Sequence, residues 1–283
     1  MFVLDPMGWA DCFTPEDLIE EMFRQLPDLS FPIPLLDIAK ACGIADVVDI
    51  SQLANTIKDK PSRAFPEGFL IDKNKCSGVI FYKDNEIAPY RKRFTIAHEL
   101  AHFLFPHHIN KLSLDDIERG DVSEKISRRH EHEKEADWFA AELLLPKHLL
   151  HDALNSQSLT LQFVKDLSDT SRFSFAPLLN RCITLLDTMS FVAIHSKDGV
   201  CGQIWTNWDV LPGELLLAKG DPLPDLSVFC KQINIKEEHI TEKTEVDVNS
   251  WFSLLLDEFT GNVYEQTYYQ QNGYTITLLI INK

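Results

Sequence analysis

The sequence predicts an α+β protein: a mostly helical N-terminal domain with a small β-sheet, followed by a smaller C-terminal α+β domain. Two observations predict this organisation. Segments with helical spacing of apolar residues surround short apolar segments bounded by turn residues, and strand-like segments dominate after Thr188. We therefore expect domains at residues 1–187 and 188–283, with a helical extension over about residues 147–187.

The helices are predicted by apolar periodicity and by residues suited to their ends. Thr14 suits an N-cap and Pro15 the first helical position, whereas Gly43 ends the second helix. Asp121 has capping-box spacing to Glu124 and opens a long helix. The expected helices cover residues 15–26, 34–42, 91–105, 121–145, 159–167 and 175–186.

Short apolar segments flanked by Gly, Asn and Asp predict the strands. The dipeptide Asp198-Gly199 lies between two of them and fits a hairpin turn. The expected strands cover residues 68–72, 78–83, 191–194, 202–205 and 274–281. The second helix carries the pattern Leu-x-x-Ala-x-x-x-Gly-Ile, which leaves a DNA-binding helix-turn-helix as an alternative, although no basic recognition helix follows it.

Composition argues against several classes of function. The chain has 283 residues, is 45% hydrophobic and 25% charged, and carries a net charge of −16, so direct binding of nucleic acid is not expected. The N-terminus lacks the features of a secretory signal, and no apolar run approaches the roughly 20 residues of a membrane helix. The six cysteines form no C-x-x-C pair, which favours reduced thiols. We expect a cytoplasmic protein without membrane association.

The segment RKRFTIAHELAHFLF contains the pattern His-Glu-x-x-His at residues 98–102. In a helix, His98 and His102 lie one turn apart on the same face and can aim two imidazoles at one metal ion. Catalytic zinc usually has three protein ligands and a water whose pKa falls to about 7, and Glu99 is placed to act on that water as general base. Apart from the motif itself, residues 94–105 carry no charged side chain, and burying such a cluster without a metal would cost several kcal/mol.

A third ligand is expected from the helix over residues 121–145. Spacing of about 100° per residue places Ala136, Phe139, Ala140, Leu143 and Leu144 on its buried face. Glu133 lies nearer the centre of that face than Glu135, so Glu133 is the favoured ligand and Glu135 the alternative. Asp137, one turn after Glu133, can accept a hydrogen bond from a ligand histidine and fix its tautomer.

Other polar side chains near the motif have less definite roles. His130 and His132 lie in a charged helical segment and are expected to be solvated, although either could stabilise the oxyanion of a tetrahedral intermediate. Tyr82 and Tyr90 are further candidates for that task. The pair His107-His108 is expected at the exit of the motif helix.

These features resemble the ImmA/IrrE-type metallo-endopeptidases of bacteria and their mobile elements. The resemblance rests on the two-part motif at residues 93–102 and 133–146 and covers about residues 15–187. It implies a zincin-like fold of the gluzincin type, with zinc bound by His98, His102 and Glu133 and with Glu99 as general base. The strand at residues 78–83 is expected to pair with the extended substrate.

The resemblance also implies a substrate class. Members of this family typically cut a helix-turn-helix repressor and so switch on a phage, mobile-element or stress operon, which makes such a repressor the expected protein partner. The alternative is a non-catalytic metal-binding regulator, or a toxin–antitoxin-like partner, that binds a protein through the same cleft. Zinc is the expected metal, although a His/His/Glu set also binds Mn²⁺ and Fe²⁺.

Overall fold

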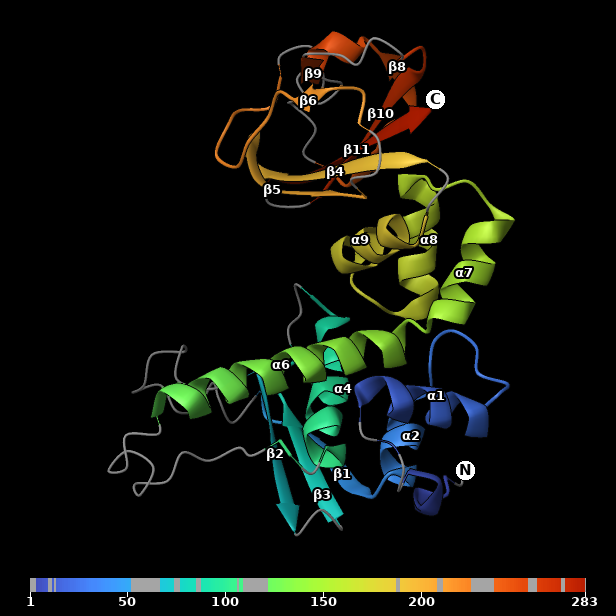
Figure 1. The fold of residues 1–283 in the computed structure, drawn as a ribbon, viewed down its shortest axis with the longest axis vertical. Coiled ribbons are helices and arrows are strands. Elements are labelled where there is room, and N and C mark those ends of the chain that lie inside the picture. Colours follow the sequence, from blue (N-terminus) through green and yellow to red (C-terminus); the bar gives the residue numbers. More distant parts are fainter. Residues whose placement is uncertain are drawn as a thin grey trace. The chain divides into compact units, whose positions relative to one another are not determined.

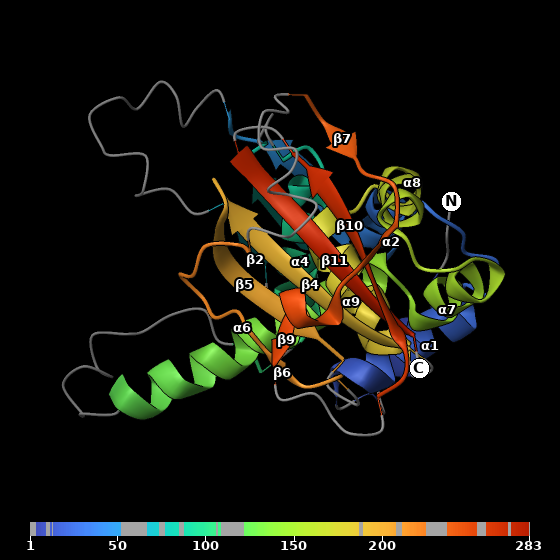
Figure 2. The ribbon, with the colours of Figure 1, turned by 90° about the horizontal axis from the view of Figure 1, so that it is seen from above.

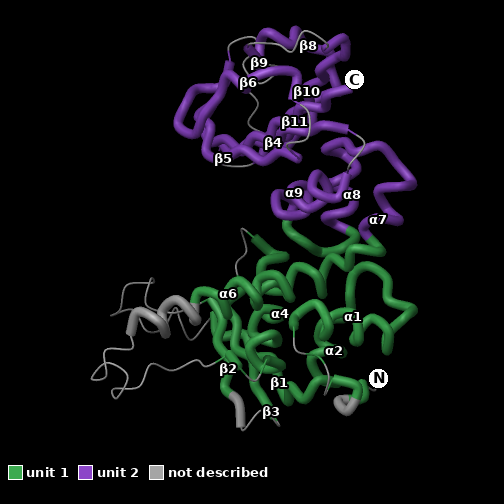
Figure 3. Tube along the Cα trace, in the orientation of Figure 1, with its two compact units in different colours: residues 1–149, 170–174 green, residues 150–169, 175–283 purple. Residues whose placement is uncertain are grey.

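A computed structural model describes most of the chain and divides it into two compact units. Unit 1 comprises residues 1–149 and 170–174, and unit 2 comprises residues 150–169 and 175–283 (Figure 3). The described residues are 4–9, 12, 14–51, 67–73, 77–84, 88–105, 107–108, 122–186, 189–207, 211–224, 237–253, 259–270 and 273–282.

Unit 1 contains most of the helices predicted for the N-terminal part, together with a three-stranded sheet (Figure 1). Thr14 caps the first helix by accepting a hydrogen bond from the Asp17 amide, as its position predicted. Gly43, with φ of 105°, ends the second helix in the left-handed conformation that favours glycine. In chain order the elements are η1 (Pro6–Trp9), α1 (Pro15–Gln25), α2 (Leu35–Ala41), β1 (Ile44–Asp49), β2 (Gly68–Lys73), β3 (Ser77–Tyr82), α4 (Arg91–Leu104) and α6 (Val122–Leu144).

The sheet of unit 1 has the order β1-β3-β2, with β1 parallel and β2 antiparallel to β3. One alternative and one expectation from the sequence are wrong here. The strand after α2 takes the place of a recognition helix, which rules out the helix-turn-helix interpretation. The strand at residues 78–83 is central and paired on both sides, so it has no free edge for a substrate; among the described strands, β2 is the edge next to α4.

Helix α4 packs against β2 and β3 on one side and against α6 on the other (Figure 1). The side chains predicted for the buried face of α6, namely Ala136, Phe139, Ala140, Leu143 and Leu144, are all 0–1% exposed. Most apolar residues of α4 are also buried, among them Ala97, Leu100 and Ala101 at 0%. The motif helix is therefore enclosed by apolar packing, with His98 and His102 facing Glu133 of α6.

Gly68 lies where β2 approaches α4 most closely. A Cβ atom at residue 68 would lie 2.3 Å from Cγ2 of Thr95 and 3.2 Å from Oε1 of Glu99. The absence of a side chain at residue 68 therefore makes room for the glutamate of the motif.

Substitution Gly68→Ala is expected to destabilise unit 1 by about 1–3 kcal/mol, because a well-packed site must shift to admit the methyl group. Urea unfolding followed by circular dichroism measures this change. The matched control is Gly202→Ala in unit 2, where the new Cβ would lie 3.4 Å from His195 O, an ordinary contact distance. Equal loss of stability in the two variants would contradict the close-approach argument.

Unit 2 is built on a six-stranded sheet that contains the path β5-β4-β11-β10-β7, with β8 also pairing with β10 (Figure 2). The predicted hairpin is confirmed: β4 and β5 flank Asp198 and Gly199, whose φ values are 51° and 79°. The described elements associated with this unit are α7 (Lys147–Ser156), α8 (Leu161–Ser171), α9 (Phe175–Leu185), β4 (Ser190–Lys197), β5 (Val200–Thr206), β6 (Glu214–Leu215), β7 (His239–Ile240), β8 (Thr244–Val246), η3 (Val248–Ser250), β9 (Phe252–Ser253), β10 (Asn262–Tyr269) and β11 (Tyr274–Asn282).

The central strands of unit 2 are buried on both faces. One face contributes Val192, Leu279 and Ile281 to an apolar cluster around Trp251, whose indole N–H donates to the buried Glu265 carboxylate at 3.0 Å. On the other face, Tyr268 packs against Phe175 of α9. The helices α8 and α9 thus supply the helical layer of a unit whose described residues beyond 188 form strands and one short 3-10 helix.

The predicted boundary at residues 187/188 lies between α9 and β4, whereas the compact units part near residues 149/150. The predicted division stays a prediction. Three features considered in the sequence analysis fall outside the described residues: Cys76, Cys230 and the Asp121 cap. The four described cysteines are free thiols. Within the described part of the chain, no helix combines the length and apolar character needed to cross a membrane.

Candidate metal centre

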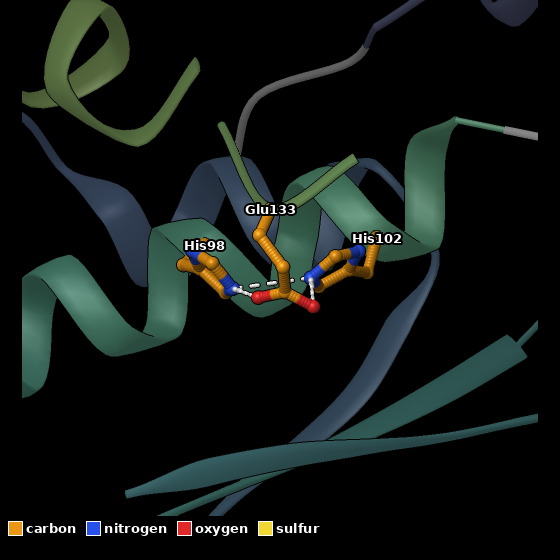
Figure 4. A group of neighbouring side chains, drawn as sticks. All are labelled: His98, His102 and Glu133. Carbon is orange, nitrogen blue, oxygen red and sulfur yellow. Dashed lines mark hydrogen bonds and ion pairs between the residues drawn. The ribbon is translucent and has the colours of Figure 1, made fainter. Parts of the chain in front are cut away.

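Three side chains from two helices converge beside the buried seam between α4 and α6. His98 and His102 project from successive turns of α4 toward the Glu133 carboxylate, which comes from α6 (Figure 4). The Nε2 atoms of the two histidines lie 3.0 Å apart. Glu133 places Oε2 3.2 Å from His98 Nε2 and Oε1 3.8 Å from His102 Nε2. The structure therefore brings together the three residues favoured from the sequence.

These separations suit a tetrahedral zinc ion. Bonds of about 2.0–2.1 Å place neighbouring ligand atoms roughly 3.3 Å apart, close to the values found here. The outer nitrogens of both imidazoles already have partners: His98 Nδ1 lies 2.9 Å from Asp137 Oδ1, and His102 Nδ1 lies 2.9 Å from His108 Nδ1. When each histidine carries its proton on Nδ1, the lone pairs of the two Nε2 atoms face each other across 3.0 Å. A cation bound between the two Nε2 atoms accepts both lone pairs. The residues present fit zinc.

Asp137 occupies the position predicted for it, one turn beyond Glu133. Its carboxylate accepts the hydrogen bond from His98 Nδ1 and thereby leaves Nε2 to face the cluster. Burial alone would lower the pKa of His98, but the Asp137 hydrogen bond and the charges of Glu99, Asp137 and Glu133 outweigh it and raise the pKa.

Glu99 is held in an apolar setting next to the cluster. Only 9% of the residue is exposed, and its carboxylate lies beside Gly68 at the start of the edge strand β2. Burial raises its pKa to about 7, with His98 acting to lower it and Glu133 to raise it further. The carboxylate is thus desolvated and adjacent to the three donors, which is the setting of a group that exchanges a proton near neutral pH.

The raised pKa of Glu99 predicts a stability change in the metal-free protein. Between pH 4.5 and 7 the Glu99 carboxyl keeps its proton in the folded protein but has lost it in the unfolded chain. The contribution of Glu99 to stability is therefore complete below about pH 4.5 and is lost as the pH rises through about 7. Glu99→Gln is therefore expected to stabilise the chelated protein by roughly 1–3 kcal/mol at pH 8 and to change little at pH 5.

Denaturant unfolding of the chelated protein at the two pH values measures this difference. Glu131→Gln, at an exposed glutamate of α6, is the matched control and should leave the pH dependence of stability unchanged. A gain in Glu99→Gln that is equal at pH 5 and pH 8 would contradict a buried, ionisable Glu99.

A second cluster, which the sequence did not predict, is formed by His107, His108 and Glu135. The Nε2 atoms of His107 and His108 lie 2.8 and 2.9 Å from the same oxygen, Oε2 of Glu135. Because residues two apart on a helix point in nearly opposite directions, Glu133 and Glu135 reach different histidine pairs. Burial lowers the pKa of His108 to about 4, partly offset by Glu135, so this imidazole is neutral at pH 7.

The remaining candidates are placed away from the three donors. His130 is exposed, as expected, whereas His132 stacks on the His108 ring with centroids 4.7 Å apart and belongs to the second cluster. Tyr82 and Tyr90 line a cavity of about 510 Å³ together with Arg93 and Arg172. Oxyanion stabilisation by any of these side chains stays a prediction.

Comparison with protein families finds a match over the central part of the chain. Residues 50–182 match the family model Peptidase_M78, described as the IrrE N-terminal-like domain, which confirms the resemblance to ImmA/IrrE-type proteins. The matched segment contains His98, Glu99, His102, Glu133 and Asp137. It ends within α9, so it includes helices that the compact units assign to unit 2. No curated protein matches the chain.

Proposed function

We propose that this chain is a zinc-dependent endopeptidase, because residues 50–182 match the family model of the IrrE N-terminal-like domain. In this proposal His98, His102 and Glu133 hold the metal, and Glu99 is the general base. The observation that carries it is the buried, desolvated Glu99 carboxylate beside three metal donors, because a site that only bound metal would have no use for an adjacent base.

The protein's own residues account for the steps around the metal. When bound, zinc supplies Lewis acidity toward a water and toward the carbonyl of the scissile bond. Glu99 accepts the proton of the attacking water and later returns it to the leaving amine. Asp137 keeps the proton of His98 on Nδ1 and so preserves the orientation of that ligand.

The edge strand β2 supports an extended polypeptide as substrate. Its backbone pairs only with β3 among the described strands, and Gly68 at its start lies next to Glu99. Ile71 on the same strand is 58% exposed, which leaves an apolar side chain for a partner to cover. A peptide that adds to this edge would run past the general base, held mainly by main-chain hydrogen bonds.

We propose a helix-turn-helix repressor-type protein as the substrate and the bacterial cytoplasm as the location, following the resemblance to ImmA/IrrE-type peptidases. The test is incubation of the zinc-loaded protein with a helix-turn-helix protein encoded beside it, followed by mass spectrometry. Discrete fragments that disappear with chelator and return with zinc support the proposal. Stable binding of an intact partner, unchanged by chelator, would instead indicate the non-catalytic regulator.

A further inference from the structure

We propose that His108 and Glu135 form an outer imidazole–carboxylate pair that positions the metal ligand His102 and keeps its proton on Nδ1. This inference rests on the proposed metal centre. It assigns His108 and Glu135 a role outside the ligand set, whereas the sequence analysis considered Glu135 only as the alternative ligand. Its effect is on the affinity and geometry of the metal site, so it can be measured without a peptide substrate.

The three side chains form a continuous chain of contacts leading away from the metal cluster. His102 Nδ1 lies 2.9 Å from His108 Nδ1, and His108 Nε2 lies 2.9 Å from Glu135 Oε2. Both imidazoles are nearly inaccessible to solvent, with His102 4% and His108 3% exposed. Buried polar atoms in such a chain must be matched as donor and acceptor at every link.

Only one arrangement of protons matches every link when His102 binds metal through Nε2. Its Nδ1 then carries the proton and donates to His108 Nδ1, which accepts with its lone pair. His108 consequently carries its own proton on Nε2 and donates it to the Glu135 carboxylate. The anionic end of the chain stabilises the proton positions along it, and both imidazole planes are fixed.

The alternative use of these residues is a second metal site formed by His107, His108 and Glu135, whose donor atoms lie within 4.8 Å of one another. A metal on His108 Nε2 would move the proton of His108 to Nδ1 and set it against the Nδ1 proton of His102 at 2.9 Å. In addition, His107 and His108 approach the same oxygen, Glu135 Oε2, at 2.8 and 2.9 Å, so each imidazole can donate its Nε2 proton to that carboxylate. The proton arrangement therefore favours the positioning role.

Neighbouring rings hold His108 in the required orientation. His132 stacks on it with an interplanar angle of 20°, and Phe105 contacts it at a centroid distance of 4.9 Å. The two metal histidines are then supported differently: His98 directly by Asp137, whose side chain is 61% exposed, and His102 through His108, whose side chain is fully buried. The buried route protects the His102 link from competition with water.

The test compares zinc affinities of the full-length protein by chelator competition. Glu135→Gln and His108→Phe are each expected to bind zinc about 10–100-fold more weakly than wild type, the usual effect of losing an outer partner. His108→Asn should retain more affinity than His108→Phe, because its amide oxygen can accept from His102 Nδ1. A role in packing alone predicts the opposite order, since phenylalanine fills the space of the ring better.

A control variant and a spectroscopic measurement complete the test. Glu131→Gln, an exposed glutamate on the same helix, should leave zinc affinity unchanged, and Co²⁺-loaded Glu135→Gln should show a shifted visible absorption spectrum. Wild-type affinity in both Glu135→Gln and His108→Phe would overturn the positioning role while leaving the metallopeptidase intact. Binding of two zinc ions by wild type, with one lost and the other unaffected in Glu135→Gln, would overturn it in favour of a second metal site. Failure of wild type to bind zinc would overturn both proposals.

Discussion

Replacing Glu133 with alanine is expected to weaken zinc binding by more than the 10–100-fold that the loss of an outer partner causes. Glu133 provides the only carboxylate within 4.8 Å of both His98 Nε2 and His102 Nε2 in the cluster that the described residues form. Its removal leaves two neutral imidazoles, which neither balance the charge of the cation nor complete the three-ligand set of a catalytic site.

Chelator competition measures this loss of zinc affinity, and the zinc affinity of the Glu135→Ala variant is the matched comparison. Both residues lie on α6, but only Glu133 faces the metal histidines. We expect the Glu133 variant to lose far more affinity than the Glu135 variant. The reverse order would make Glu135 the ligand, which was the alternative that the sequence left open.

Local periodicity was sufficient to predict that the side chains of His98, His102 and Glu133 come together. The i, i+4 spacing fixes His98 and His102 on one face of α4, and the apolar residues of α6 define the seam from which Glu133 projects. Both arguments use residues within one helix, where geometry follows from sequence. The same reasoning placed Asp137, since it shares a face with Glu133.

Features that depend on contacts between distant segments were not predictable in this way. The spacing of residues 78–83 showed a strand, but its central position depends on parallel pairing with β1, which lies more than 30 residues earlier. Similarly, the helical pattern of α6 shows that Glu135 points away from Glu133 but not that His108 lies there to receive it. Whether two distant elements come into contact depends on the path of the chain between them. The spacing of apolar residues within one element does not predict that path.

The C-terminal part illustrates the same limit at a larger scale. Strand-like segments after residue 188 and the turn at Asp198-Gly199 were predicted from local signals. The pairing of β11 between β4 and β10 joins segments some 80 residues apart, and the association of this sheet with α8 and α9 depends on packing such as that of Tyr268 on Phe175. The boundary predicted at residues 187/188 lies between these helices and the sheet, and local sequence character could not show that the two pack together.

Glu99→Gln is expected to abolish most peptide cleavage while zinc remains bound. Removing a general base typically slows a reaction by about 10²–10⁴-fold, and glutamine preserves the shape of the side chain but cannot take the proton from water. His98, His102 and Glu133 remain in place, so zinc affinity should stay within a few-fold of wild type. Loss of cleavage with retained metal therefore separates the base from the ligands.

The measurement pairs single-turnover cleavage of the helix-turn-helix protein with chelator competition on the same samples, and Glu131→Gln serves as the control for an exposed glutamate. Because Gln at residue 99 still leaves the β2 edge and the metal cluster intact, this variant should hold its substrate and release it uncut. Undiminished cleavage by Glu99→Gln would contradict the general-base role, whereas cleavage absent from wild type and variant alike, with equal partner binding in both, would favour the non-catalytic regulator. The buried carboxylate beside Gly68 decides between these functions, because only the enzyme requires it to ionise.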